Sequence, residues 1–156
     1  TPALPFHLNP NTSTTFILHR DWADLQNKTV SVVVQTSQGY EAFKTVTGPL
    51  VKLNVSNIQF FNTTATAFYF NVTVQNSAVP PVTVNIKLVT VYVEGQNITI
   101  GTVTPTLPQA LPADSKLLLS CTWDWNQFKG KSATVTIYTT QGFKSSSTQT
   151  TIPDTP

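Results

Sequence analysis

The stretch DWNQFKGKSATVTIYTTQGF, from Asp124 to Phe143, decides the fold because the chain contains it twice. The earlier copy, DWADLQNKTVSVVVQTSQGY, runs from Asp21 to Tyr40, and an offset of 103 relates the two copies without a gap. Under this offset, residues 1–47 match residues 104–150 at 14 identical positions. Self-similarity at a fixed period is the mark of a repeat protein. The sequence therefore predicts two copies of one structural unit.

The two copies are not equally complete. The offset makes one unit about a hundred residues long, so residues 1–48 hold only the C-terminal half of a unit. Residues 49–156 hold a complete unit with a short C-terminal tail. We expect the strands that should precede the half-unit to come from another segment of a longer protein or from a neighbouring subunit.

Strand patterning recurs along the chain. In residues 29–36, Val30, Val32 and Val34 alternate with polar neighbours, which is typical of a strand with one buried face. An irregularity near Leu88 indicates a bulge or a strand covered on both faces. Short strands joined by Pro, Gly and Asn turns predict an all-β fold, an immunoglobulin-like antiparallel β-sandwich. The other expected strands are residues 14–18, 51–58, 65–75, 82–93, 98–103, 116–123, 133–140 and 145–152.

Two residue types of the repeat have a structural interpretation. Trp22 and Trp125 each precede a core strand, where a large aromatic side chain can close the end of a sandwich. Gly39 and Gly142 follow such a strand, and glycine there permits a positive φ. These four residues are the structural signature of the repeat.

The composition argues against several partners. Charged residues form 10% of the chain, far below the roughly 25% of soluble domains. The nine Lys and Arg residues are scattered, whereas a nucleic-acid surface needs clustered cations. No stretch approaches the roughly 20 consecutive apolar residues of a membrane-spanning helix. We therefore expect no nucleic acid and no membrane span in this chain.

Six N-x-[ST] sequons indicate N-linked glycans and an extracellular address. Asn54 and Asn71 lie opposite the apolar face of their expected strands, so both should point outward. Asn62 and Asn97 fall in expected turns. The six candidate glycosylation sites are Asn11, Asn27, Asn54, Asn62, Asn71 and Asn97.

The sequence contains no arrangement that predicts catalysis. His19 and Asp21 are close in sequence, yet no Gly-x-Ser-x-Gly elbow accompanies them, and the repeat replaces His19 with Thr122. We expect the carboxylates of Asp21 and Asp124 to accept hydrogen bonds from backbone N–H groups of a turn. The carboxylates show no paired spacing for glycoside hydrolysis, and no phosphate-binding loop or CxxC motif occurs. We predict no enzyme activity, no cofactor and no metal site.

Cys121 is the only cysteine, so no disulfide can form within the chain. The repeat offset aligns Cys121 with Leu18, which indicates a small apolar residue that fills space in the core.

The repeated Trp-x5-Lys…Thr-x-Gln-Gly-[Tyr/Phe] unit, the sequons and the Thr-rich composition resemble the immunoglobulin-like repeats of archaeal cell-surface glycoproteins. That family includes the stalk subunits of surface layers and glycosylated filaments called threads, which assemble by strand donation. The resemblance implies a structural, non-enzymatic role at the cell surface, with copies of the chain joined head to tail. An adhesive or carbohydrate-binding module of a larger secreted protein is the alternative. It requires an exposed aromatic platform, for which the candidates are Trp22, Trp123, Trp125 and Tyr138.

Overall fold

The computed structural model describes residues 3–18, 22–64 and 67–154, and all its regular structure is antiparallel β-sheet apart from two short 3-10 helices. No α-helix occurs in these ranges, and no helix in them is long and apolar enough to cross a membrane. The expected all-β class is confirmed.

Three sheets contain the strands, and the two larger ones build the region after residue 49. The four-stranded sheet has the order β3-β4-β9-β7, with the bounds β3 Leu53–Thr64, β4 Ala67–Asn76, β9 Lys116–Thr122 and β7 Thr102–Thr104. The other large sheet has the order β11-β10-β5-β6, with the bounds β11 Lys144–Ser146, β10 Ser132–Thr139, β5 Val84–Val93 and β6 Gln96–Thr99. At its margins, β12 (Thr150–Thr151) pairs with β10, and β8 (Gln109–Leu111) pairs with β5.

Alternating side chains give these two sheets a common core. In β4, every second residue from Phe68 to Asn76 is buried, and in β10 every second residue from Ala133 to Thr139 is buried. This period of two places the apolar residues of each strand on one face. The buried residues of both sheets form a single hydrophobic cluster.

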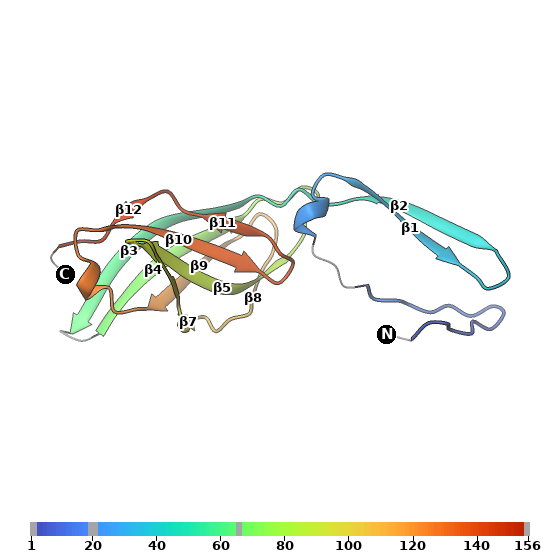
Figure 1. Ribbon diagram of the computed structural model, residues 1–156, viewed down its shortest axis with the longest axis horizontal. Coiled ribbons are helices and arrows are strands. Elements are labelled where there is room, and N and C mark those ends of the chain that lie inside the picture. The colour runs from blue at the N-terminus through green and yellow to red at the C-terminus, as the bar shows by residue number, and fades with distance from the viewer. Residues whose placement is uncertain (1–2, 19–21, 65–66, 155–156) are drawn as a thin grey trace.

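The third sheet is a separate hairpin of β1 (Thr29–Gln35) and β2 (Glu41–Thr47), preceded by the 3-10 helix η1 (Ala23–Leu25). Figure 1 shows this hairpin at one end of the long axis of the molecule and the C-terminus at the other end. All but one residue of its two strands are exposed. The hairpin therefore lies outside the common core.

The structure corrects several of the expected elements. Residues 14–18 form no strand: their repeat counterpart β9 pairs with β4 and β7, whereas no described strand pairs with residues 14–18. The expected strand 98–103 is two strands, β6 and β7, in different sheets. Neither β2 nor β8 was predicted from the sequence. The predicted irregularity in β5 is present: the register of β5 with β10 shifts between Tyr138 and Thr139, opposite Leu88 and Ile86.

Candidate functional site

The N-terminal hairpin is a structural copy of the C-terminal one. The helix η2 (Asn126–Phe128) follows η1 by 103 residues at both of its ends, and β10 begins 103 residues after β1. The residue after each helix has nearly the same backbone, with φ −56° and ψ 130° at Gln26 and φ −51° and ψ 140° at Lys129. The sequence repeat is thus a repeat of local structure.

The turns of the two hairpins share the same hydrogen bonds. The N–H of Thr36 donates to the carbonyl oxygen of Tyr40 (2.8 Å), and the N–H of Thr139 donates to that of Phe143 (2.9 Å). In return, the N–H groups of Tyr40 and Phe143 each donate to the threonine hydroxyl at 3.0 Å. The two repeated threonines therefore close the turns with their side chains as well as their backbones.

The signature glycines have the conformation expected from the sequence. Gly39 has φ +86° and Gly142 has φ +87°, a left-handed backbone that favours glycine. Each turn needs this conformation at the same place, which explains why the glycine is present in both copies.

Trp125 is a residue of the hydrophobic core. Its side chain is fully buried, and its indole N–H donates to the carbonyl oxygen of Tyr69 (3.2 Å). The ring lies edge-on to Phe60 and Phe68, with centroids 5.6 and 5.0 Å away. A buried indole cannot serve as a ligand platform, so Trp125 is removed from the candidates for carbohydrate binding.

The other candidates for that platform are partly covered. Trp22 is half-buried against the common core, and its backbone N–H donates to the carbonyl oxygen of Gln141 (3.1 Å). Trp123 is half-buried and stacks on Phe128 with centroids 5.5 Å apart, and Tyr138 is half-buried. Because Trp22 and Trp123 both pack against the hydrophobic core, neither offers the open ring face that a platform requires.

The hairpins differ in what covers them. Val135 and Ile137 of β10 have no exposed surface, whereas their counterparts Val32 and Val34 of β1 are 41% and 55% exposed. Tyr40, the counterpart of the buried Phe143, is 75% exposed. The half-unit therefore presents to the surface an apolar face that the complete unit buries.

The hairpin also has an open edge. In the complete unit, β10 pairs with β11 on one side and with β5 on the other. Among the described residues, β1 pairs with β2 alone, so the edge of β1 that corresponds to the β5 side has unpaired backbone groups. We name this edge and the face with Val30, Val32 and Val34 the open hairpin surface.

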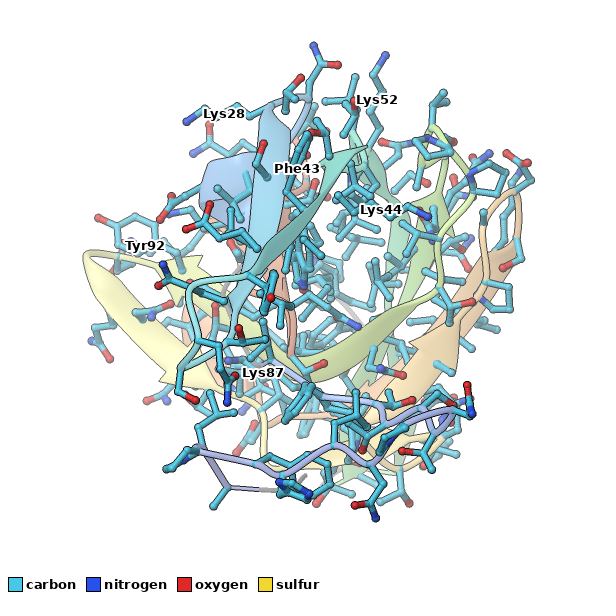
Figure 2. All side chains as sticks on the ribbon, turned by 90° about the vertical axis from the view of Figure 1, so that its right-hand side faces the viewer. Lys28, Phe43, Lys44, Lys52, Lys87 and Tyr92 are labelled. Carbon is cyan, nitrogen blue, oxygen red and sulfur yellow. The ribbon has the colours of Figure 1, made fainter. Side chains whose placement is uncertain are left out.

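The opposite face of the hairpin has one apolar pair that the complete unit lacks. Phe43, which is 78% exposed, lies opposite Val33 in the register of β1 and β2. Figure 2 shows Phe43 on the hairpin, at the end of the molecule that faces the viewer. The counterparts are Thr136 and Ser146, and their hydroxyl oxygens are hydrogen-bonded at 2.8 Å. Phe43 was not predicted from the sequence, because residues 41–47 were not expected to form a strand, although the repeat offset aligns them with residues 144–150.

The six sequons differ in accessibility. Two asparagines, both in the four-stranded sheet, are half-buried: Asn62 and Asn71. Four are exposed: Asn11, Asn27, Asn54 and Asn97.

The positions of three sequons in strands refine the expectations. Asn71 alternates with buried residues of β4, as predicted, but its side-chain oxygen is buried without a hydrogen-bond partner. The turn prediction for Asn62 and Asn97 is wrong: Asn62 lies within β3, and Asn97 is the second residue of β6, the strand that follows the Glu94-Gly95 turn. Both strands extend further than the hydrophobic pattern indicated because pairing with β4 and β5 continues through polar residues.

The residues considered for chemistry do not converge in the described part of the chain. His7 and Asp24 are exposed, while His19 and Asp21 lie outside the described residues. Asp124 accepts a hydrogen bond from the backbone N–H of Asn126 (3.1 Å), as expected for a turn aspartate. No group of three or more His, Cys, Asp or Glu residues that could hold a metal ion occurs in the ranges 3–18, 22–64 and 67–154.

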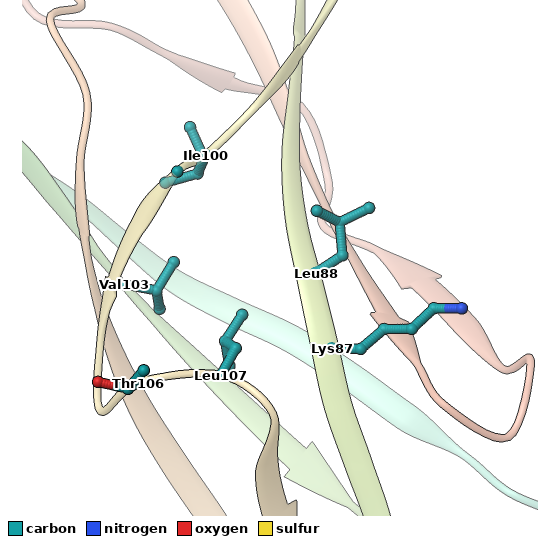
Figure 3. A pocket seen from close by; sticks show the side chains of 7 residues that line it. Lys87, Leu88, Ile100, Val103, Thr106 and Leu107 are labelled. Carbon is teal, nitrogen blue, oxygen red and sulfur yellow. The ribbon is translucent and has the colours of Figure 1, made fainter.

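A shallow cavity of about 220 Å³ lies between β5 and the chain around β7 (Figure 3). Its polar side chains are those of Lys87 and Thr106, and Figure 3 shows the Lys87 amine pointing away from the apolar residues. This lining offers no pair of groups for acid–base chemistry. The full lining is Lys87, Leu88, Ile100, Gly101, Val103, Thr106 and Leu107.

Cys121 lies fully buried in β9, and burial raises the pKa of its thiol to about 12. This position agrees with the expected role as an apolar residue of the core.

Comparisons with protein-family models, with curated proteins and with solved structures give no match to this chain. The inference of function therefore starts from the chain's own residues, and above all from the open hairpin surface.

Proposed function

We propose that this chain is a non-enzymatic structural subunit of an extracellular, glycosylated filament or surface layer that assembles through β-strand complementation. Its fold in this proposal is an immunoglobulin-like sandwich, with one complete unit preceded by the C-terminal half of another. The resemblance to archaeal cell-surface glycoproteins belongs to the same proposal.

The strand order supports the immunoglobulin-like assignment. In that fold, one sheet has the order A-B-E-D and the other contains G-F-C. The order β3-β4-β9-β7 corresponds to the first, and β11-β10-β5 corresponds to the second, with β6 in the place of C′. By the repeat offset, β1 and β2 are then the F and G strands of the half-unit.

The open hairpin surface is the observation that carries the proposal. Fully burying one exposed valine stabilises a protein by roughly 1.5–3 kcal/mol. Val32 and Val34 are each about half exposed and Tyr40 is 75% exposed, so covering all three should stabilise the assembly by on the order of a few kcal/mol, before the loss of chain entropy. The unpaired edge of β1 adds backbone donors and acceptors that an added strand would satisfy.

The repeat specifies the strand that fits. In the complete unit, β5 runs antiparallel to β10, with Val91 opposite Val135 and Val93 opposite Ala133. The matching partner of β1 is therefore an antiparallel strand with apolar side chains opposite Val32 and Val30. If each copy supplies such a strand to its neighbour, the contact is head-to-tail and propagates into a filament.

A pair of lysine substitutions in β1 tests this proposal. Val32 and Val33 are adjacent and both exposed, but they lie on opposite faces of the hairpin. Val32→Lys places a charge on the open hairpin surface and should abolish concentration-dependent assembly, whereas the matched control Val33→Lys should preserve it. Sedimentation velocity and electron microscopy of the native protein and both variants provide the measurement. A native protein that stays a monodisperse monomer, or equal assembly of both variants, would contradict the proposal.

A further inference from the structure

Tyr92 and Asn97 form a cross-strand pair on the outside of the second large sheet. Tyr92 of β5 lies directly opposite Asn97 of β6, and the two-residue turn Glu94-Gly95 joins the strands. Both turn residues have positive φ, 49° and 78°, as a type I′ hairpin turn requires. In such a hairpin the pair one step from the turn is not hydrogen-bonded, so its side chains approach most closely.

Both side chains of this pair are accessible. Asn97 is exposed. Tyr92 is 53% exposed, although the residues before and after it in β5, Val91 and Val93, are fully buried. Figure 2 shows Tyr92 at the outer surface of the molecule. On its other side, Tyr92 lies opposite Thr134 of β10, which leaves the ring uncovered by any larger residue in register.

The chemistry of a sequon fits this neighbour. Asn97-Ile98-Thr99 is an acceptor for an N-linked sugar, whose first ring carries a face of C–H groups. An aromatic ring has a negative face that attracts such weakly positive hydrogens. Opposite residues in a sheet have Cβ atoms about 4.5–5.5 Å apart, so a sugar on Asn97 is within reach of the Tyr92 ring.

We propose that an N-linked glycan on Asn97 packs its first sugar against the ring of Tyr92. The inference rests on the glycosylation that is part of the proposed function, and it assigns Tyr92 as the residue that orders this glycan. It does not depend on strand complementation at the hairpin.

Asn54 provides a matched control within the chain. It is also an exposed sequon asparagine in a strand, but its register partner in β4 is Gln75. Gln75 in turn lies opposite Lys116, so no aromatic residue faces Asn54 in register. A glycan on Asn54 should remain free in solvent.

Nitration of tyrosine tests the contact on the intact chain purified from a glycosylating host. Peptide mapping first establishes the occupancy of Asn97. Tetranitromethane should then modify Tyr92 about three- to tenfold more slowly in the glycosylated chain than in Asn97→Gln, as expected for a contact of aromatic-pair strength. Tyr40, which is 75% exposed on the distant hairpin, should react equally in both. Unmodified Asn97, or equal rates at Tyr92, would overturn the inference.

A thermal-unfolding cycle provides the second readout. Asn97→Gln should lower the unfolding temperature of the glycosylated chain when Tyr92 is present and have little effect in a Tyr92→Thr background. Asn54→Gln should leave it unchanged in both. If Asn97→Gln has the same effect in both backgrounds, the glycan does not pack on Tyr92. Assembly measured with Val32→Lys is a separate result, so failure of this contact and failure of the filament proposal are distinguishable.

Discussion

Cys121 gives the clearest expectation at the scale of a single residue. It is fully buried in β9, in register between Phe70 and Val103. Burial raises the pKa of its thiol from the ordinary 9.0 to about 12, because the thiolate would lose its hydration. In the unfolded chain the thiol ionises near its ordinary value. The neutral thiol therefore stabilises the fold fully below pH 9.0, and this contribution is lost as the pH rises toward about 12.

The measurement compares the native chain with Cys121→Ala. Other groups also titrate in this range, so the useful quantity is the difference between the two free energies of unfolding at each pH. We expect this difference to be constant up to about pH 8 and then to shrink, because only the native chain gains a thiolate on unfolding. A difference that stays constant to pH 11 would show that the thiol ionises equally in both states.

The signature residues could be predicted from the sequence because their roles are local. The positive φ of Gly142 and the hydrogen bond of Asp124 to its turn depend on neighbouring residues only. The pairing of Tyr92 with Asn97 could not be predicted, because it depends on the register set by the Glu94-Gly95 turn. A prediction that treats residues 98–103 as one strand cannot give the register between β5 and β6.

At the scale of an element, the turn between β10 and β11 connects three parts of the molecule. The side-chain oxygen of Gln141 accepts hydrogen bonds from the backbone N–H of Asn85 (3.0 Å) and from the hydroxyl of Thr140 (3.1 Å). Its backbone carbonyl accepts from the N–H of Trp22. This explains why a glutamine precedes the glycine in the repeated Gln-Gly pair of the complete unit.

The two repeated glutamines form a matched pair for mutation. Gln141→Ala leaves the partly buried N–H of Asn85 without a partner and should lower the free energy of unfolding by about 1–3 kcal/mol. Gln38→Ala, at the corresponding exposed position of the open hairpin, should change it by less than about 0.5 kcal/mol. Urea unfolding followed by tryptophan fluorescence gives both values. Equal effects would mean that the contact with Asn85 contributes little.

Elements with a strong alternating pattern were found from the sequence, and those that depend on a distant partner were not. β4 and β10 alternate over their whole length, so both were expected. Residues 14–18 have similar apolar content, yet a strand exists only where another strand pairs with it. The three-residue strand β8 is a strand because it pairs with β5, between Val84 and Ile86.

At the scale of the whole molecule, the half-unit is attached through a short junction. The side-chain oxygen of Gln26 accepts from the N–H of Val51 (2.9 Å), and the N–H of Asn27 donates to the carbonyl oxygen of Gly48 (3.1 Å). A side chain at Gly48 would collide with the backbone oxygen of Leu25. The boundary expected between residues 48 and 49 therefore coincides with a close backbone approach that the repeat offset alone could not indicate.

This arrangement predicts that the complete unit folds without the half-unit. The buried residues of the hydrophobic cluster lie between Val55 and Ile152, and of the described residues before 49 only Trp22 and Ala23 pack against it. A chain that begins at Pro49 should therefore unfold cooperatively, within a few degrees of the full-length midpoint. Calorimetry of the two chains makes the comparison.

Residues 1–48 by themselves should behave in the opposite way. An isolated two-stranded hairpin is marginally stable in water. In this hairpin, all strand residues but one are exposed, so it has almost no core of its own. We expect circular dichroism of this fragment to show an unfolded chain that gains β-structure when a peptide with the sequence of β5 is added. A fragment that is already folded alone would mean that the hairpin needs no partner, and the open hairpin surface would then lose its role in assembly. Ordering on addition of the peptide would instead tie the repeat in the sequence directly to the strand that the half-unit lacks.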